Sequence, residues 1–115
     1  MAQIGQFTRT HSGYSGRVRT LSLDLAIVFV PVDNADVENA PDYRIRLGDE
    51  DGIEIGAGWI QSGDRAGTYI SVVLDDPSLA LPIRARLFQS DENGRDWGLH
   101  WTRQKKRDDQ GKAQD

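Results

Sequence analysis

Aromatic and basic side chains recur along the second half of the chain, and this combination of residue types binds single-stranded nucleic acid. Aromatic rings stack on unpaired bases, while arginine and lysine side chains attract the phosphate backbone. The candidate residues for such a surface are Arg84, Arg86, Trp97, Arg103, Lys105 and Lys106. Trp59, Tyr69 and Trp101 would extend the same aromatic surface.

The three tryptophans also have a purely structural interpretation. Strand alternation places Trp59, Trp97 and Trp101 on the same face as Ile55 and Leu99. Large aromatic side chains that share a face with aliphatic ones usually belong to the core. The sequence favours the core position and leaves the binding surface as the alternative.

Acidic side chains gather in the middle of the chain. Between residues 33 and 54 there are eight acidic and only two basic residues, within a net charge of −4 for all 115 residues. Such a surface can steer a basic protein partner towards the chain. The candidate protein-binding residues are Asp33, Asp36, Glu38, Asp49, Glu50 and Asp51. A pI near 5.1 also argues against a dedicated binder of duplex DNA, whose affinity depends on neutralising phosphates.

The glycine-rich and acidic loops do not match nucleotide-binding or calcium-binding motifs. Gly56 and Gly58 lack the third glycine of a dinucleotide fingerprint, because Gln61 occupies that position and a strand follows. In the EF-hand register of the loop at 48–52, Leu47 and Gly58 fall at ligand positions that neither can serve.

The remaining reactive residues also lack a catalytic arrangement. His100 lies between Leu99 and Trp101 and should face away from the tryptophans, and Asp75-Asp76 precedes a proline as in an ordinary turn. There is no cysteine, so disulfides and thiolate metal sites are excluded. We therefore expect no enzyme activity, no metal site and no cofactor.

The elements that would position these residues are short strands. Apolar residues recur at a period of two, which is the strand signature, and turn-forming clusters of Gly, Asp, Asn, Ser and Pro separate the runs. The runs lie at residues 21–29, 43–47, 53–59, 69–74, 81–87 and 97–101. They predict an all-β fold: a single small antiparallel barrel or sandwich of six to eight short strands over residues 1–102.

The C-terminal segment 103–115 has Ala113 as its single apolar residue and is predicted to be a disordered, charged tail. The N-terminus lacks a secretory signal, and the longest apolar run, 25–32, is too short to cross a bilayer. We expect a cytoplasmic protein without a membrane partner. An exposed edge strand would allow a homodimer as well as a monomer.

Residues 1–102 resemble a family of small bacterial proteins known only as domain of unknown function 736. The matching segments are 4–7 (IGQF), 16–21 (GRVRTL), 40–44 (APDYR), 56–59 (GAGW), 69–72 (YISV), 74–78 (LDDPS) and 82–83 (PI). The resemblance implies a cytoplasmic bacterial protein, often encoded on conjugative plasmids and integrative elements. It implies no activity. The first functional hypothesis is therefore a non-enzymatic interaction module that binds a protein through its acidic surface, and the alternative is weak single-stranded nucleic-acid binding.

Overall fold

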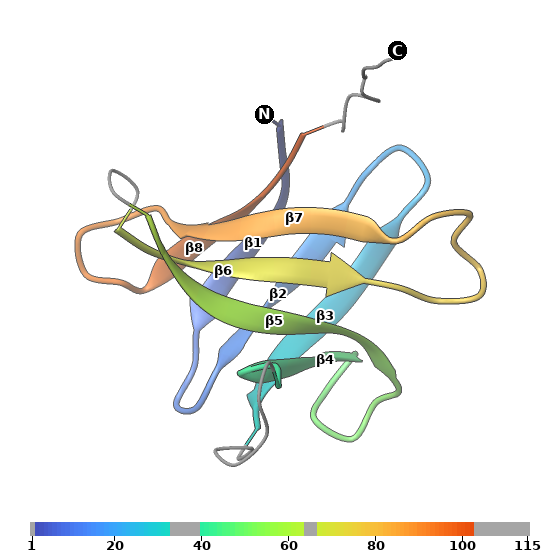
Figure 1. The fold of residues 1–115 in the computed structure, drawn as a ribbon, viewed down its shortest axis with the longest axis horizontal. Coiled ribbons are helices and arrows are strands. Elements are labelled where there is room, and N and C mark those ends of the chain that lie inside the picture. Colours follow the sequence, from blue (N-terminus) through green and yellow to red (C-terminus); the bar gives the residue numbers. More distant parts are fainter. Residues whose placement is uncertain (1, 33–39, 64–66, 103–115) are drawn as a thin grey trace.

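The computed structural model describes residues 2–32, 40–63 and 67–102. These residues form eight antiparallel strands and no helix (Figure 1). The strands are β1 (Ala2–Arg9), β2 (Tyr14–Arg19), β3 (Asp24–Pro31), β4 (Tyr43–Leu47), β5 (Glu54–Gly63), β6 (Gly67–Leu74), β7 (Ile83–Gln89) and β8 (Asp96–Trp101). Since this part of the chain has no helix, it has no helix that is long and apolar enough to cross a membrane.

The strands form a closed up-and-down barrel. Each strand pairs with the next one along the chain, and β8 returns to pair with β1, which leaves no free sheet edge. The all-β antiparallel prediction is confirmed, and the barrel replaces the sandwich as the architecture. The predicted charged tail and the acidic residues Asp33, Asp36 and Glu38 lie outside the described residues.

The core occupies the inside of the barrel. Side chains that point inward from all eight strands are almost fully buried, as the period-two pattern predicts. They are Phe7, Tyr14, Val18, Ile27, Phe29, Ile45, Ile55, Ile70, Val72, Leu74, Ala85, Leu87, Trp97 and Leu99. Trp97 is 5% exposed, so the prediction that it belongs to the core is confirmed. Trp101 pairs with Ala85 and packs against the same core.

A β-bulge in β5 changes which residues face inward. Arg46 pairs with Glu54 and Ile45 pairs with Gly56, so Ile55 is an extra residue between two consecutive pairs. An extra residue shifts the alternation by one, and every later side chain on the strand faces the opposite side.

Trp59 therefore faces outward, and its predicted core position beside Ile55 is wrong. It pairs with Ser71, whose neighbours Ile70 and Val72 point into the core. Gly58 takes the inward position instead. A Cβ atom there would lie 2.9 Å from Cγ2 of Ile70, so this glycine permits close packing inside the barrel.

The turns alternate between the two ends of the barrel, because each strand runs opposite to its neighbours. We call the end formed by the turns at 20–23, 48–53 and 75–82 the open end (right-hand side of Figure 1). The other end, which includes the turns at 10–13 and 90–95, is the closed end.

Candidate functional site

The open end carries exposed aliphatic side chains. Leu21, Ile53 and Leu81 are 106%, 62% and 77% exposed, and each comes from a different turn. The sequence pattern predicted all three to lie within strands. In the structure β5 begins one residue after Ile53, β7 begins two residues after Leu81, and β3 begins three residues after Leu21. In their turns these side chains have no neighbouring strand to cover them, and Ile53 also lies at the mouth of the barrel.

A cavity of about 160 Å³ opens at this mouth. Its inner wall consists of one aliphatic side chain from each of five consecutive strands. These are Leu25 of β3, Leu47 of β4, Ile55 of β5, Leu74 of β6 and Ile83 of β7. Ile53 and Leu79 lie at its rim, so apolar surface continues from the cavity onto the exposed turns.

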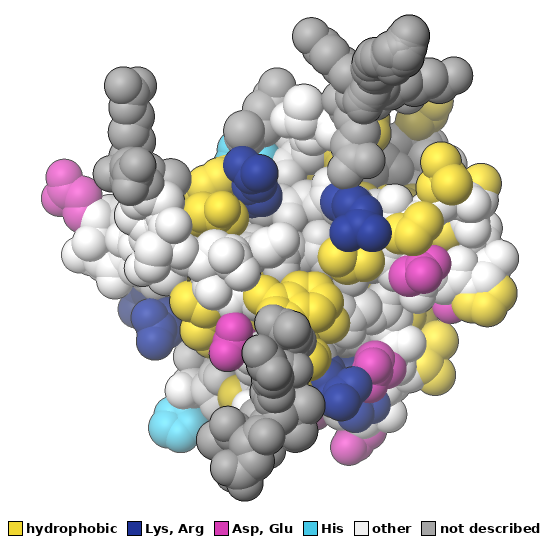
Figure 2. Space-filling view, viewed as in Figure 1, with side chains coloured by type: hydrophobic (Ala, Val, Ile, Leu, Met, Phe, Trp, Pro, Cys, Tyr) yellow, Lys and Arg dark blue, Asp and Glu magenta, His cyan; other side chains and the backbone are white. Residues whose placement is uncertain are grey.

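The same three turns are acidic. They carry five carboxylates and no lysine or arginine: Asp49, Glu50, Asp51, Asp75 and Asp76. Within the described part of the chain none of these five carboxylates forms an ion pair. Figure 2 shows hydrophobic and acidic side chains together on the right-hand side of the molecule, where the open end lies. The end is therefore apolar in its centre and negatively charged around it.

Local hydrogen bonds shape the acidic turns. The Asp51 backbone N–H donates to Oδ1 of Asp49 at 2.9 Å, and Gly48 opens the turn with φ of 85°. At the third turn the Ser78 hydroxyl and backbone N–H both donate to Oδ2 of Asp76, at 2.6 and 2.9 Å. These two hydrogen bonds lower the pKa of Asp76, because they stabilise its ionised form.

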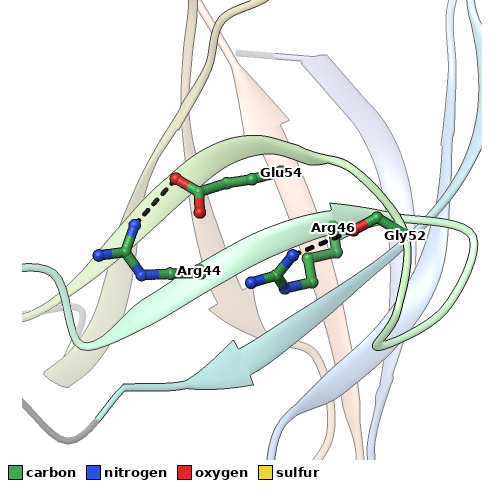
Figure 3. A network of polar contacts seen from close by, with 4 residues as sticks. All are labelled: Arg44, Arg46, Gly52 and Glu54. Atoms are coloured by element: carbon green, nitrogen blue, oxygen red, sulfur yellow. Dashed lines mark hydrogen bonds and ion pairs between the residues drawn. The ribbon is translucent and has the colours of Figure 1, made fainter.

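The two arginines of β4 contact the acidic turn and the strand after it without pairing with the carboxylates of the turn (Figure 3). Arg46 donates from Nη1 to the Gly52 carbonyl oxygen at 3.1 Å. Arg44 forms an ion pair with Glu54 of β5, with 2.9 Å between Nη1 and Oε2. Neither arginine therefore pairs with Asp49, Glu50 or Asp51 at the tip of the turn.

The structure places half of the predicted protein-binding residues together. Asp49, Glu50 and Asp51 lie on one exposed turn of the open end, while the other three are outside the described residues. The exposed aliphatic side chains at the same end of the barrel were not predicted from the sequence. The available signal was the occurrence of Leu21, Ile53 and Leu81 within or next to turn-forming clusters, where a large apolar residue has no core to enter.

A second cluster lies on the outside of the barrel, across β5 to β8. We call it the aromatic face and define it by Trp59, Tyr69, Arg84, Arg86, Phe88 and His100. The pairing register places them on the outward side, because Trp59 pairs with Ser71, Ser71 with Arg86, and Arg86 with His100. In Figure 2 dark blue Lys and Arg side chains lie beside hydrophobic ones over the β5–β7 region.

The structure places the predicted nucleic-acid-binding residues in different environments. Arg84 and Arg86 are exposed on the aromatic face. Trp97 cannot stack on a base, because it is buried in the core and donates from Nε1 to the Gly94 carbonyl oxygen at 2.8 Å. Arg103, Lys105 and Lys106 lie outside the described residues. The outward position expected for His100, opposite Trp97, is confirmed by its pairing with Arg86.

Among the described residues, no group of three or more His, Asp or Glu side chains is placed to hold a metal ion.

Comparison with known proteins identifies the family but not an activity. No curated protein and no solved structure matches this sequence. A family model described as "Protein of unknown function (DUF736)" matches residues 3–104, which include all eight strands of the barrel except the first residue of β1. The chain therefore belongs to the DUF736 family.

Proposed function

We propose that this chain is a non-enzymatic interaction module whose open end binds a basic segment of another protein. The observation that carries the proposal is the coincidence, at one end of the barrel, of exposed Leu21, Ile53 and Leu81 with five carboxylates, in three turns that carry no lysine or arginine. Exposed apolar patches with a polar rim are typical of protein-binding sites. The expected partner segment carries one or two apolar side chains flanked by lysine or arginine.

The energetics of the open end fit this kind of ligand. Burial of one exposed leucine or isoleucine side chain contributes about 1.5–3 kcal/mol. Two or three such contacts can offset the cost of immobilising a short peptide. The carboxylates contribute mainly to the rate of association and to the choice of a basic partner.

The charge of the open end argues against a second copy of the chain as its occupant. Two open ends facing each other would bring their acidic turns together, with five carboxylates on each side. Like charges at an interface oppose association. A basic segment would gain from the same charges.

The proposal includes the biological setting that the family resemblance implies. We propose a cytoplasmic bacterial protein encoded on mobile DNA, where proteins that handle DNA carry the basic segments that this end would recognise. The family model supports membership alone, so the setting rests on the resemblance.

The experiment selects peptides from a random displayed library on the immobilised full-length protein. The enriched peptides are then synthesised, and their binding to the protein is titrated. We expect enrichment of Leu, Ile or Phe next to Lys or Arg. Ile53→Ser should weaken the binding of an enriched peptide at least about tenfold, as expected for a lost aliphatic contact. Ile60→Ser is the matched control, because Ile60 is 49% exposed on the same strand but lies towards the closed end.

A second pair of variants tests the charge. Glu50→Gln should slow association and reduce its dependence on salt, whereas Glu92→Gln, in the closed-end turn at 90–95, should not. Equal binding to Ile53→Ser and the native protein would overturn the proposal, as would enrichment of acidic peptides. A dimer in sedimentation that Leu81→Ser dissociates would assign the open end to a second copy instead.

A further inference from the structure

The aromatic face differs in charge from the rest of the molecule. Around the rings, its strands present outward positions that contain two arginines and a histidine, and the outward acidic residues of these strands, Glu54 and Asp96, are the first residues of β5 and β8. The positions around the rings are Ala57, Trp59, Gln61, Tyr69, Ser71, Val73, Arg84, Arg86, Phe88, Gly98 and His100. The whole chain has a net charge of −4, so this stretch of surface is a local exception.

Three rings of the aromatic face form a connected row on the outside of the barrel. The Tyr69 and Phe88 ring centroids are 5.3 Å apart with an angle of 36° between the rings. Phe88 and His100 continue the row at 5.6 Å. All three side chains are half-buried, so each ring keeps part of its surface open to solvent. Aromatic side chains on the outer face do not serve the core, which the inward side chains already fill.

Arg86 links the row to a positive charge. Its guanidinium carbon lies 5.5 Å from the centroid of the Tyr69 ring, which is a cation–π arrangement. Arg84 lies two residues earlier on β7 and therefore projects from the same side of the sheet. Arg86 and the Tyr69 ring hold each other in place before any ligand arrives.

We propose that the aromatic face binds single-stranded nucleic acid, with bases stacked on Tyr69 and Phe88 and phosphates attracted by Arg84 and Arg86. Stacking on half-exposed rings requires unpaired bases, and the exposed Arg84 and Arg86 beside the rings attract the phosphate backbone. Two arginines are too few to hold a duplex, whose binders neutralise many phosphates. The site shares no residue with the open end and does not depend on the peptide-binding proposal.

The test is the fluorescence anisotropy of a labelled oligothymidylate of about 12 nucleotides, titrated with the full-length protein. We expect binding at low salt that weakens with salt at a log–log slope of about −1.4, from two phosphate contacts at −0.7 each. Arg86→Ala should halve this slope and weaken binding. Tyr69→Ala should weaken binding about fivefold or more, and Tyr69→Phe should restore it.

Matched controls distinguish binding at the aromatic face from general electrostatic attraction between the protein and the oligonucleotide. Arg19→Ala removes the same charge from β2, which is not one of the strands of the face, and should leave the affinity and the slope almost unchanged. Ile53→Ser at the open end should bind the oligonucleotide normally. Circular dichroism and thermal unfolding of each variant show whether the barrel is intact.

Three outcomes would overturn the inference. They are no binding at low salt, an equal loss for Arg19→Ala and Arg86→Ala, and full affinity in Tyr69→Ala. Effective competition by a duplex of the same sequence would also contradict it, because paired bases cannot reach the rings. If Ile53→Ser loses its peptide but keeps the oligonucleotide, the two sites are independent. A failure of the oligonucleotide alone would leave the peptide proposal standing.

Discussion

The two ends of the barrel are built from different side chains. At the closed end Tyr14 makes edge-to-face contacts with Phe29, Tyr43 and Trp97, at centroid distances of 5.8, 5.6 and 5.1 Å. Tyr14, Phe29 and Trp97 belong to the core, and Tyr43 packs against it. The open end has aliphatic side chains around a cavity instead, with leucines and carboxylates outside it. The difference indicates that aromatic packing stabilises the closed end, and it is the open end for which we propose binding.

The largest expected effect is at the closed end. Trp97→Ala should destabilise the barrel by about 3–5 kcal/mol, because it removes a buried aromatic side chain and leaves a cavity. Urea unfolding measures this loss. Trp97→Phe keeps most of the packing but loses the bond from Nε1 to the Gly94 carbonyl, so it should cost roughly 1–3 kcal/mol. A loss below about 1 kcal/mol in Trp97→Ala would contradict the stabilising role of this end.

The second effect depends on pH and also concerns the closed end. Burial, followed by the neighbouring Tyr43, raises the pKa of Tyr14 from 10.0 to about 12. The unfolded chain loses this proton near pH 10 while the folded chain keeps it. The stabilisation is therefore complete below pH 10 and disappears as the pH rises through 12.

Two pKa units correspond to about 3 kcal/mol. Urea unfolding across this pH range should show a steep loss of stability in the native protein and a shallower one in Tyr14→Phe, which has no proton to lose. The other two tyrosines, Tyr43 and Tyr69, are present in both proteins. Parallel curves for the two proteins would show that Tyr14 is not buried as the closed end requires.

The smallest expected effect is at the open end. Leu21→Ser and Leu81→Ser should change the free energy of unfolding by less than about 0.5 kcal/mol, since both side chains are already exposed. Urea unfolding of these variants, measured in parallel with the Trp97 variants, allows the two ends to be compared directly. Destabilisation by more than about 1 kcal/mol would mean that the open end is part of the core. Unchanged stability with lost peptide binding would sharpen the division between the two ends.

The fold was predictable wherever a strand has one apolar side. The runs at 43–47, 69–74 and 97–101 match β4, β6 and β8 closely. Strands β1 and β2 were harder to recognise, because Gly5 and Gly16 occupy inward positions where an apolar residue would normally mark the core side. A Cβ atom at Gly16 would overlap the backbone and the Phe7 ring, so the core in that region requires glycine.

The candidate sites were predictable only in part. The acidic residues at 49–51 and the arginines at 84 and 86 could be named from their types. Their partners could not, because Leu21 and Leu81 looked like strand residues and Phe88 was not recognised as part of an aromatic cluster. The contacts among Tyr69, Phe88 and His100 join three different strands, and no local pattern reveals such contacts.

The sequence alone determined that the chain is all-β, because alternation and turn chemistry are local properties of neighbouring residues. Tertiary structure decided that β1 pairs with β8 and closes the barrel, since this pairing joins residues almost 100 positions apart. It also decided to which side of the sheet Trp59 points. The bulge at Ile55 depends on the register between β4 and β5, and that one extra residue moves the indole from the core side to the outer face.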